Sequence, residues 1–292
     1  MSKIAIITDV NAGLDYIGYD PQIPTLRSVI NFGEEHLVDG IEIRADEFYE
    51  RLKKVKSKED IPSTSAPTLG DMMIMIEDHI KQGYTDIILF SISYKLSSIG
   101  QTFMTLKEEY ADRINLYSVN TKTATYLQGY YALRAKEMVK EGKSVEEILE
   151  YSEYLINHSH AYFVVDSLDY LVKNGRLSRF SGTLASWLAI KPILELNEEG
   201  AIVTFDKVRT YSKAIERLKE LVIGEIGDSQ DVVIQVIQSG NIETCKQIVK
   251  ELKEYYGNRA EVGLQYITPA VGAHIGRDVV GIGYFILDKF KK

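Results

Sequence analysis

The amino-acid sequence predicts an α/β protein of two domains, with largely parallel sheets flanked by helices. Short apolar runs rich in β-branched residues alternate along the chain with amphipathic helical patterns, which is the order of elements in βαβ units. These runs are apolar almost without interruption, as expected for strands covered on both faces. The chain has 292 residues, and the alternation starts afresh after residue 158. We therefore expect an N-terminal domain at 1–158 and a C-terminal domain at 159–292.

The individual elements follow from this alternation in chain order. Strands are expected at 3–8, 86–91, 114–119, 161–165, 231–237 and 280–287. Helices are expected at 45–56, 69–82, 123–141, 145–157, 211–222 and 243–256. Two further stretches, 37–43 and 193–209, have the pattern of antiparallel hairpins, and the second turns at the sequence NEEG.

Two of the expected helices begin with a side-chain cap. Thr68 precedes the apolar run, and Asp71 stands at the third helical position, the spacing in which the threonine hydroxyl accepts from a free backbone N–H. Ser144 and Glu147 form the same arrangement before 145–157. Both patterns predict a helix start at the next residue.

Composition argues against several classes of protein. The formal net charge is −8, and phosphate contacts need clustered Lys and Arg, so nucleic-acid binding is not expected. The single cysteine, Cys245, lies in an amphipathic helical pattern and is expected to be a buried, inert thiol. No window approaches the roughly 20 apolar residues of a membrane helix, and the first residues do not resemble a signal peptide. A cytoplasmic protein without an integral membrane segment is expected.

Loops that leave the carboxyl ends of strands converge on a crevice in α/β proteins, so they are the first place to look for a ligand site. Such loops contain Asp9, the hydroxyl-rich stretch 93–98, Asp166 followed by Arg176, and His274 between glycines. Each has a structural alternative. The aspartates can cap the helices that follow them, the serines can bond to their own backbone, Arg176 can pair with a surface carboxylate, and a lone histidine is more often structural than functional.

The stretch IPSTSAPTLGD, residues 61–71, holds more hydroxyls than its local structure needs. Thr68 is explained as a helix cap, whereas Thr64 and Ser65 stand just outside a helix N-terminus, whose partial positive charge favours an anion. No phosphate loop, nucleophile elbow or H-E-x-x-H motif is present, and one cysteine with five scattered histidines gives no metal-ligand spacing. A site that holds an anion is the remaining chemical interpretation.

Six motifs in order give the chain a family resemblance: KIAIITD, STSAPT, ISYKLSS, FVVDSLDYLVKNGRLS, IKPILELNEEG and VGAHIG. They resemble the DegV family, whose bacterial members include the fatty acid-binding subunits of the fatty acid kinase system. The resemblance implies a single long-chain fatty acid as the ligand, with its acyl chain buried in a tunnel between the domains. It implies no cofactor and no active site of the subunit's own, because a separate ATP-dependent kinase subunit phosphorylates the bound fatty acid. Transient membrane contact during ligand exchange fits this role.

The resemblance also implies which residues hold the carboxylate. Thr64 and Ser65 match the first hydroxyl motif, Ser93 the second, Arg176 the third and His274 the fourth. Where the family has a second serine after Ser93, this chain has Tyr94, so the tyrosine must replace that contact or the contact is lost. The alternative function is a lipid or acyl-ester hydrolase, with a serine such as Ser93 as nucleophile and His274 as base.

Overall fold

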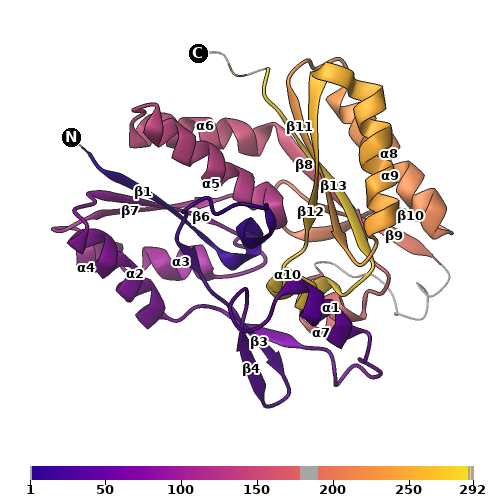
Figure 1. Ribbon diagram of the computed structural model, residues 1–292, viewed down its shortest axis with the longest axis horizontal. Coiled ribbons are helices and arrows are strands. Elements are labelled where there is room, and N and C mark those ends of the chain that lie inside the picture. Colours follow the sequence, from indigo (N-terminus) through magenta and orange to yellow (C-terminus); the bar gives the residue numbers. More distant parts are fainter. Residues whose placement is uncertain (1, 178–189, 289, 291–292) are drawn as a thin grey trace.

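The computed structural model describes residues 2–177, 190–288 and 290, and these form two large sheets, one small sheet and the helices around them (Figure 1). The α/β class predicted from the sequence is confirmed. Every strand of the four-stranded sheet precedes residue 158, and every strand of the six-stranded sheet follows it. A division into domains at that residue stays a prediction.

The first large sheet is parallel, as expected. Its order is β2 (Thr25–Leu26), β1 (Ile4–Asp9), β6 (Asp86–Ser91) and β7 (Asn115–Asn120). One face packs against α2 (Leu69–Lys81), α3 (Ile99–Met104) and α4 (Lys107–Tyr110) through Met72, Ile76 and Phe103. The other face packs against α5 (Thr125–Lys140), which lies between the two large sheets, with α6 (Val145–Asn157) beyond it (Figure 1).

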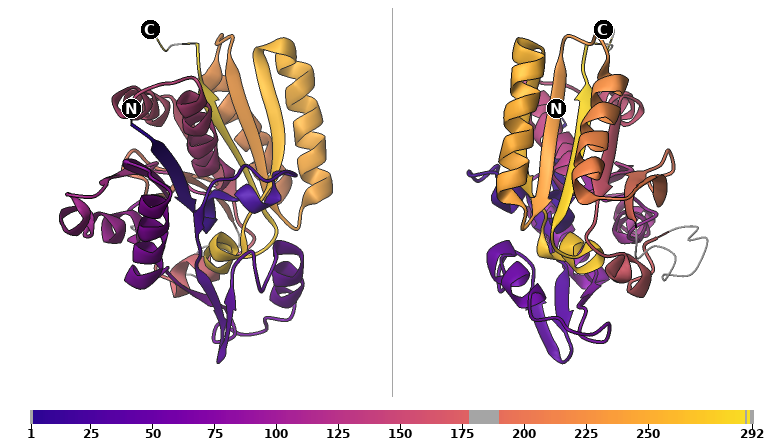
Figure 2. Two further views of the ribbon diagram at one scale, coloured as in Figure 1. Left: turned by 60° about the vertical axis from the view of Figure 1, so that its left-hand side comes forward. Right: turned by 90° about the vertical axis from the view of Figure 1, so that its right-hand side faces the viewer.

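The second large sheet is mixed, which differs from the expected parallel arrangement. Its order is β10 (Ile202–Val208), β9 (Lys191–Leu196), β8 (Ser159–Val164), β13 (Val279–Ile286), β11 (Val232–Ser239) and β12 (Ala260–Tyr266). The pairing of β11 with β12 is parallel, and the other four pairings are antiparallel. Both kinds of strand are buried on two faces here, so their apolar sequences could not reveal the strand direction. Helices α8 (Tyr211–Ile226) and α9 (Ile242–Tyr256) lie side by side on the outer face (Figure 2).

A small antiparallel sheet lies below these layers. It consists of β4 (Glu35–Val38), β3 (Val29–Phe32) and β5 (Ser63–Ser65). The expected hairpin within 37–43 is wrong: β4 ends at Val38, and its partner is β3, which lies before it in the chain. The expected hairpin at 193–209 is confirmed as β9 and β10.

Three short helices lie beside the small sheet: α1 (Ala45–Leu52), α7 (Asp169–Lys173) and α10 (Pro269–Ile275). The described residues also form 3-10 turns at Val10–Ala12, Leu14–Tyr16 and Gly257–Arg259. Helix α10 contacts β3, β5, α1 and α7. It begins at Pro269, whose fixed φ suits the first helical position, after the cap Thr268. Both predicted capping boxes, at Thr68 and Ser144, are also confirmed.

Candidate ligand-binding site

A mostly apolar cavity lies between the two large sheets. It is lined from the first half of the chain by residues that include Ile92, Leu96 and Leu127, and from the second sheet by residues that include Phe163, Ile237 and Ile282. Its volume is about 190 Å³, whereas a single water needs about 10–15 Å³ on the same measure. The space therefore suits an apolar ligand of more than ten heavy atoms.

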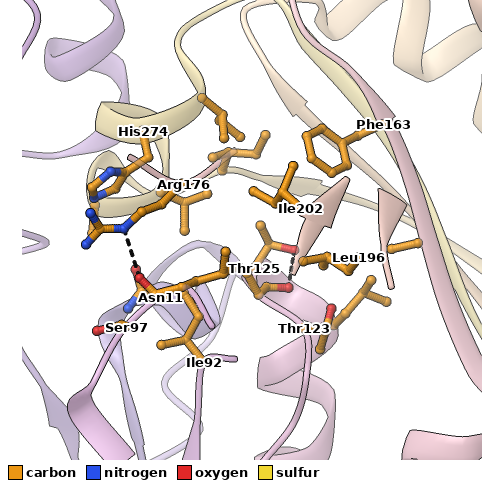
Figure 3. Close-up of a pocket in the computed structure, with 18 of the residues that line it drawn as sticks. Asn11, Ile92, Ser97, Thr123, Thr125, Phe163, Arg176, Leu196, Ile202 and His274 are labelled. Carbon is orange, nitrogen blue, oxygen red and sulfur yellow. Dashed lines mark hydrogen bonds between the residues drawn. The ribbon is translucent and has the colours of Figure 1, made fainter. Parts of the chain in front are cut away.

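Polar side chains gather at one end of this cavity (Figure 3). His274 from α10 and Arg176, which follows α7, lie next to each other there, while Phe163, Leu196 and Ile202 lie toward the opposite end, which also contains Thr123. Thr64 from β5 also lines the cavity, and its hydroxyl is 2.8 Å from His274 Nε2. The structure thus brings together three of the five residues expected to bind a carboxylate.

The strand conformation of β5 explains why Thr64 faces inward. Successive side chains of a strand point to opposite faces, and Ser63 and Ser65 on either side are exposed while Thr64 is half-buried. Pairing with β3 places Thr64 opposite Ile30. Ser65 accepts instead from Asn31 Nδ2 at 3.1 Å and does not line the cavity. Its role as a carboxylate ligand stays a prediction, which the alternation of the strand does not support.

His274 has a free hydrogen-bonding position at the polar end. Its Nδ1 atom is buried and has no hydrogen-bond partner in the described part of the chain. Burial, and then the positive charge of Arg176, lower the pKa of His274 to about 4. The ring is therefore neutral at physiological pH, with one nitrogen as a donor and the other as an acceptor. If Thr64 donates to Nε2, the proton on Nδ1 is available to an anion.

Arg176 is held by backbone carbonyls and keeps its charge for the cavity. Gly175, with φ of 65°, ends the turn after α7, and Arg176 Nε donates to the carbonyl of Leu96 at 3.0 Å. Asn174 Nδ2 donates to the carbonyl of Ala273 at 2.9 Å, which connects the same turn to α10. No carboxylate lies within ion-pair distance of Arg176 among residues 2–177, 190–288 and 290, so the alternative of a surface ion pair is not formed there.

The comparison with known proteins decides the family. Residues 3–287 match the family model described as "Uncharacterised protein, DegV family". The chain belongs to the DegV family. A DegV domain-containing protein of Staphylococcus aureus is 33% identical over 285 residues, which cover 97% of each chain. Protein DegV of Bacillus subtilis is 31% identical over 284 residues, 96% of this chain and 98% of the relative.

Solved DegV structures have the same fold. DegV of Bacillus subtilis, described as a fatty acid binding protein, has a TM-score of 0.87 at 30% identity and covers 98% of this chain and 100% of its own. A fatty acid binding DegV family protein of Streptococcus agalactiae gives 0.87 at 28% identity, with coverage of 98% and 100%. The fatty acid kinase B3 protein of Streptococcus pneumoniae, loaded with linoleic acid, shares the fold, with a TM-score of 0.81 at 20% identity and coverage of 98% and 100%.

In this DegV chain the hydroxyl-rich stretch 93–98 contains some side chains that hydrogen-bond within the protein and others that line the cavity. Ser93 is fully buried, does not line the cavity, and donates to the carbonyl of Gly200 at 2.7 Å. The hydroxyl of Tyr94 donates to Ser118 Oγ at 2.7 Å and is also absent from the lining. Ser97 and Ser98 line the cavity instead. The role of Ser93 as a carboxylate ligand stays a prediction, and its hydroxyl is engaged in joining the β9–β10 turn to the first sheet.

Four further polar residues line the cavity and were not predicted from the sequence. They are Asn11, Ser28, Thr123 and Thr125. The signal for two of them was the sequence NTKTAT, which follows β7 at the same sheet edge as the loops that were considered. Thr125 has φ of 61°, an outlier for a β-branched residue, so the backbone there is strained.

Of the two aspartates at strand ends, Asp9 has the capping role given as its structural alternative, whereas Asp166 does not cap α7. Asp9 is fully buried and caps the turn at Val10–Ala12, accepting from the backbone N–H of Asn11 at 3.1 Å and from that of Ile92 at 2.9 Å. Burial raises its pKa. Asp166 is exposed and pairs with Lys191 Nζ at 3.1 Å.

The remaining expectations concern catalysis, metals and membranes. Ser93 donates to Gly200 and His274 bonds to Thr64, so the serine–histidine pair of the hydrolase alternative is not formed.

In the described ranges no group of His, Cys, Asp and Glu could hold a metal ion. Cys245 is buried, and burial raises its pKa to about 12, so its thiol is inert as predicted. Within those same ranges, no helix has both the length and the apolar character to cross a bilayer.

Proposed function

We propose that the protein binds a single long-chain fatty acid, with the acyl chain in the cavity between the sheets and the carboxylate at Thr64, His274 and Arg176. The observation that carries this proposal is the polarity of the cavity: a mostly apolar lining ends at hydrogen-bonding side chains and at the guanidinium of Arg176, which has no carboxylate partner among the described residues. Family membership supports it, since the solved DegV relatives of Bacillus subtilis and Streptococcus agalactiae are described as fatty acid binding.

The energetics agree with this division of tasks. Each buried methylene contributes about 0.8 kcal/mol, so a long acyl chain supplies most of the affinity even after the entropic cost of ordering. The headgroup site need only prevent the burial of an unpaired carboxylate, which would be costly. The Nδ1 atom of His274, which carries the ring proton when Thr64 donates to Nε2, and the charge of Arg176 are suited to that task.

We further propose that the protein is a cytoplasmic carrier that presents its ligand to a separate ATP-dependent kinase subunit. Arg176 has charge available for the phosphate that phosphorylation would add, because its Nε and Nη1 atoms donate to backbone carbonyls and not to a carboxylate of the described residues. The shared fold with the fatty acid kinase B3 protein supports this role. Acyl phosphate formed from the bound fatty acid by a kinase subunit and ATP, trapped as a hydroxamate, would be the direct readout.

Headgroup variants test the binding proposal. Thr64→Val removes the hydroxyl that keeps the ring proton on Nδ1 of His274, and His274→Gln removes the imidazole itself. Each is therefore expected to weaken fatty acid binding by about tenfold, the cost of one lost hydrogen bond to a charged group. Isothermal titration of the delipidated protein with a long-chain fatty acid measures the change. Thr204→Val, on β10 and outside the lining, is the matched control and should bind like the parent. Equal affinities for all four proteins would contradict the assignment of the headgroup site.

A further inference from the structure

The apolar end of the cavity shares a wall with a second, more polar pocket. Four residues line both spaces: Thr123, Leu127, Ala161 and Leu196. The second pocket has a volume of about 550 Å³ and lies where α6 ends, where β8 begins and where β9 turns into β10. A ligand that runs from His274 along the apolar lining therefore meets this wall at its far end.

The shared wall contains a hydroxyl without a partner. Thr123 is only 8% exposed, and its Oγ1 atom is buried with no hydrogen-bond partner in the described ranges. A buried hydroxyl in this state costs about 1–3 kcal/mol, a penalty that a ligand oxygen would remove. Figure 3 shows Thr123 beside Leu196, across the cavity from His274.

The backbone around Thr123 is strained on both sides. Lys122 has φ of 54° and Thr125 has φ of 61°, although neither is glycine. The carbonyl of Thr123 accepts from the backbone N–H of Ser93 at 2.9 Å, which fixes the loop in this position. Strained backbone held by its surroundings is typical of ligand sites, and here it surrounds the one wall residue with an unused hydroxyl.

We propose that the cavity accepts acyl chains that carry a hydroxyl or oxo group remote from the carboxylate, with the Thr123 hydroxyl as the partner of that oxygen. This inference rests on the proposed function and extends it to a specific class of fatty acid. Because a threonine hydroxyl both donates and accepts, it can serve either a hydroxyl or a keto oxygen.

The charges beyond the wall favour a neutral oxygen over a second carboxylate. Glu198 and Glu225 line the second pocket, against a single lysine, Lys122. Glu225 already accepts from the hydroxyls of Tyr162 and Tyr284, at 2.5 and 2.6 Å. His160, also in the lining, is paired with Glu195 at 2.9 Å. A carboxylate at the far end of the ligand would therefore meet two glutamates and only one lysine.

The test uses stearic acid and a series of hydroxystearic acids in which the hydroxyl moves stepwise along the chain. Dissociation constants are measured on the delipidated full chain and on Thr123→Val, Thr123→Ser and the control Thr204→Val. One region of hydroxyl positions should bind best to the parent protein. For those ligands, Thr123→Val should raise the ratio of the hydroxystearate Kd to the stearate Kd about tenfold, whereas Thr123→Ser, which keeps the hydroxyl, and Thr204→Val should leave it unchanged.

The possible outcomes separate this inference from the proposed function. If stearic acid binds, but no hydroxyl position is preferred or Thr123→Val leaves the ratio unchanged, the inference is overturned and the proposed function stands. If no fatty acid binds to the folded parent protein, both are overturned.

Discussion

At the scale of single residues, the direction in which a side chain points decides what it can bind. Thr64 and Ser65 were both predicted as ligands from the sequence because each carries a hydroxyl beside a helix start. The structure makes 63–65 a strand, whose alternation turns one of these side chains toward His274 and the other to solvent. Likewise, the Ser93 hydroxyl is bonded to the Gly200 carbonyl of the β9–β10 turn, which is distant in the sequence, whereas Ser97 lines the cavity.

The low pKa of His274 makes the stability of the ligand-free protein depend on pH. The folded-state pKa is about 4, below the ordinary value of 6.5. As pH falls through 6.5, the unfolded chain takes up a proton that the folded chain does not, so folding stability decreases until pH 4. Between pH 7 and pH 5 this group should lower the free energy of unfolding by about 2 kcal/mol.

Urea unfolding of the delipidated parent and of His274→Gln at pH 7 and pH 5 measures this contribution. The difference between the two proteins isolates His274 from the other titrating groups. The variant should lose about 2 kcal/mol less than the parent over this interval. An identical loss in both proteins would show that His274 is not buried as a neutral ring.

At the scale of elements, local signals were predicted well and long-range pairings were not. Capping boxes lie within four residues, so Thr68 and Ser144 marked their helices correctly. The edge strand β12 was missed because polar residues interrupt its apolar pattern, and β3 and β5 were missed because each is short. The antiparallel direction of β13 arises from its pairing with β8 and β11, which no local pattern encodes.

The turn between β9 and β10 illustrates a long-range constraint that a substitution can test. Gly200 has φ of 80°, and a Cβ there would come within 2.9 Å of Lys122 Cα and still closer to Ser93 Oγ. Gly200→Ala should therefore destabilise the protein by more than about 1 kcal/mol, since it adds a backbone clash to the strain of a left-handed conformation.

The matched control for Gly200→Ala is Gly142→Ala. Gly142 has a φ of 79°, and a Cβ there would meet nothing within 4 Å, so its substitution introduces strain alone. Thermal or urea unfolding compares the two variants. The Gly200 variant should have the lower free energy of unfolding of the pair. Equal values would mean that a side chain at position 200 does not clash with Lys122 and Ser93.

At the scale of the whole molecule, the ligand cavity lies inside a core that joins the two large sheets. One continuous cluster contains Phe90 of the parallel sheet, Tyr131 of α5 and Phe285 of the mixed sheet. The cavity beside this core takes its lining from the loops that follow the strands of the first sheet, from strands of the second sheet and from α10. A ligand that fills it contacts both halves of the chain, so binding should stabilise the folded chain, and the gain should grow with the logarithm of ligand concentration.

The family could be predicted from sequence motifs, several of which lie in loops that surround the cavity. The shape of the cavity could not, since Leu127, Phe163 and Ile237 come together only through packing between sheets. Thr123 could not be predicted for the same reason, since its position in a wall shared by two pockets also arises from this packing.

The most direct test of fatty acid binding is mass spectrometry of an organic extract of the purified protein. The folded protein is incubated with a mixture of long-chain fatty acids and separated from unbound lipid by gel filtration before extraction. The proposed function predicts about one fatty acid per chain, as expected for one cavity with one headgroup site. A cleanly folded sample whose extract contains no fatty acid would contradict it.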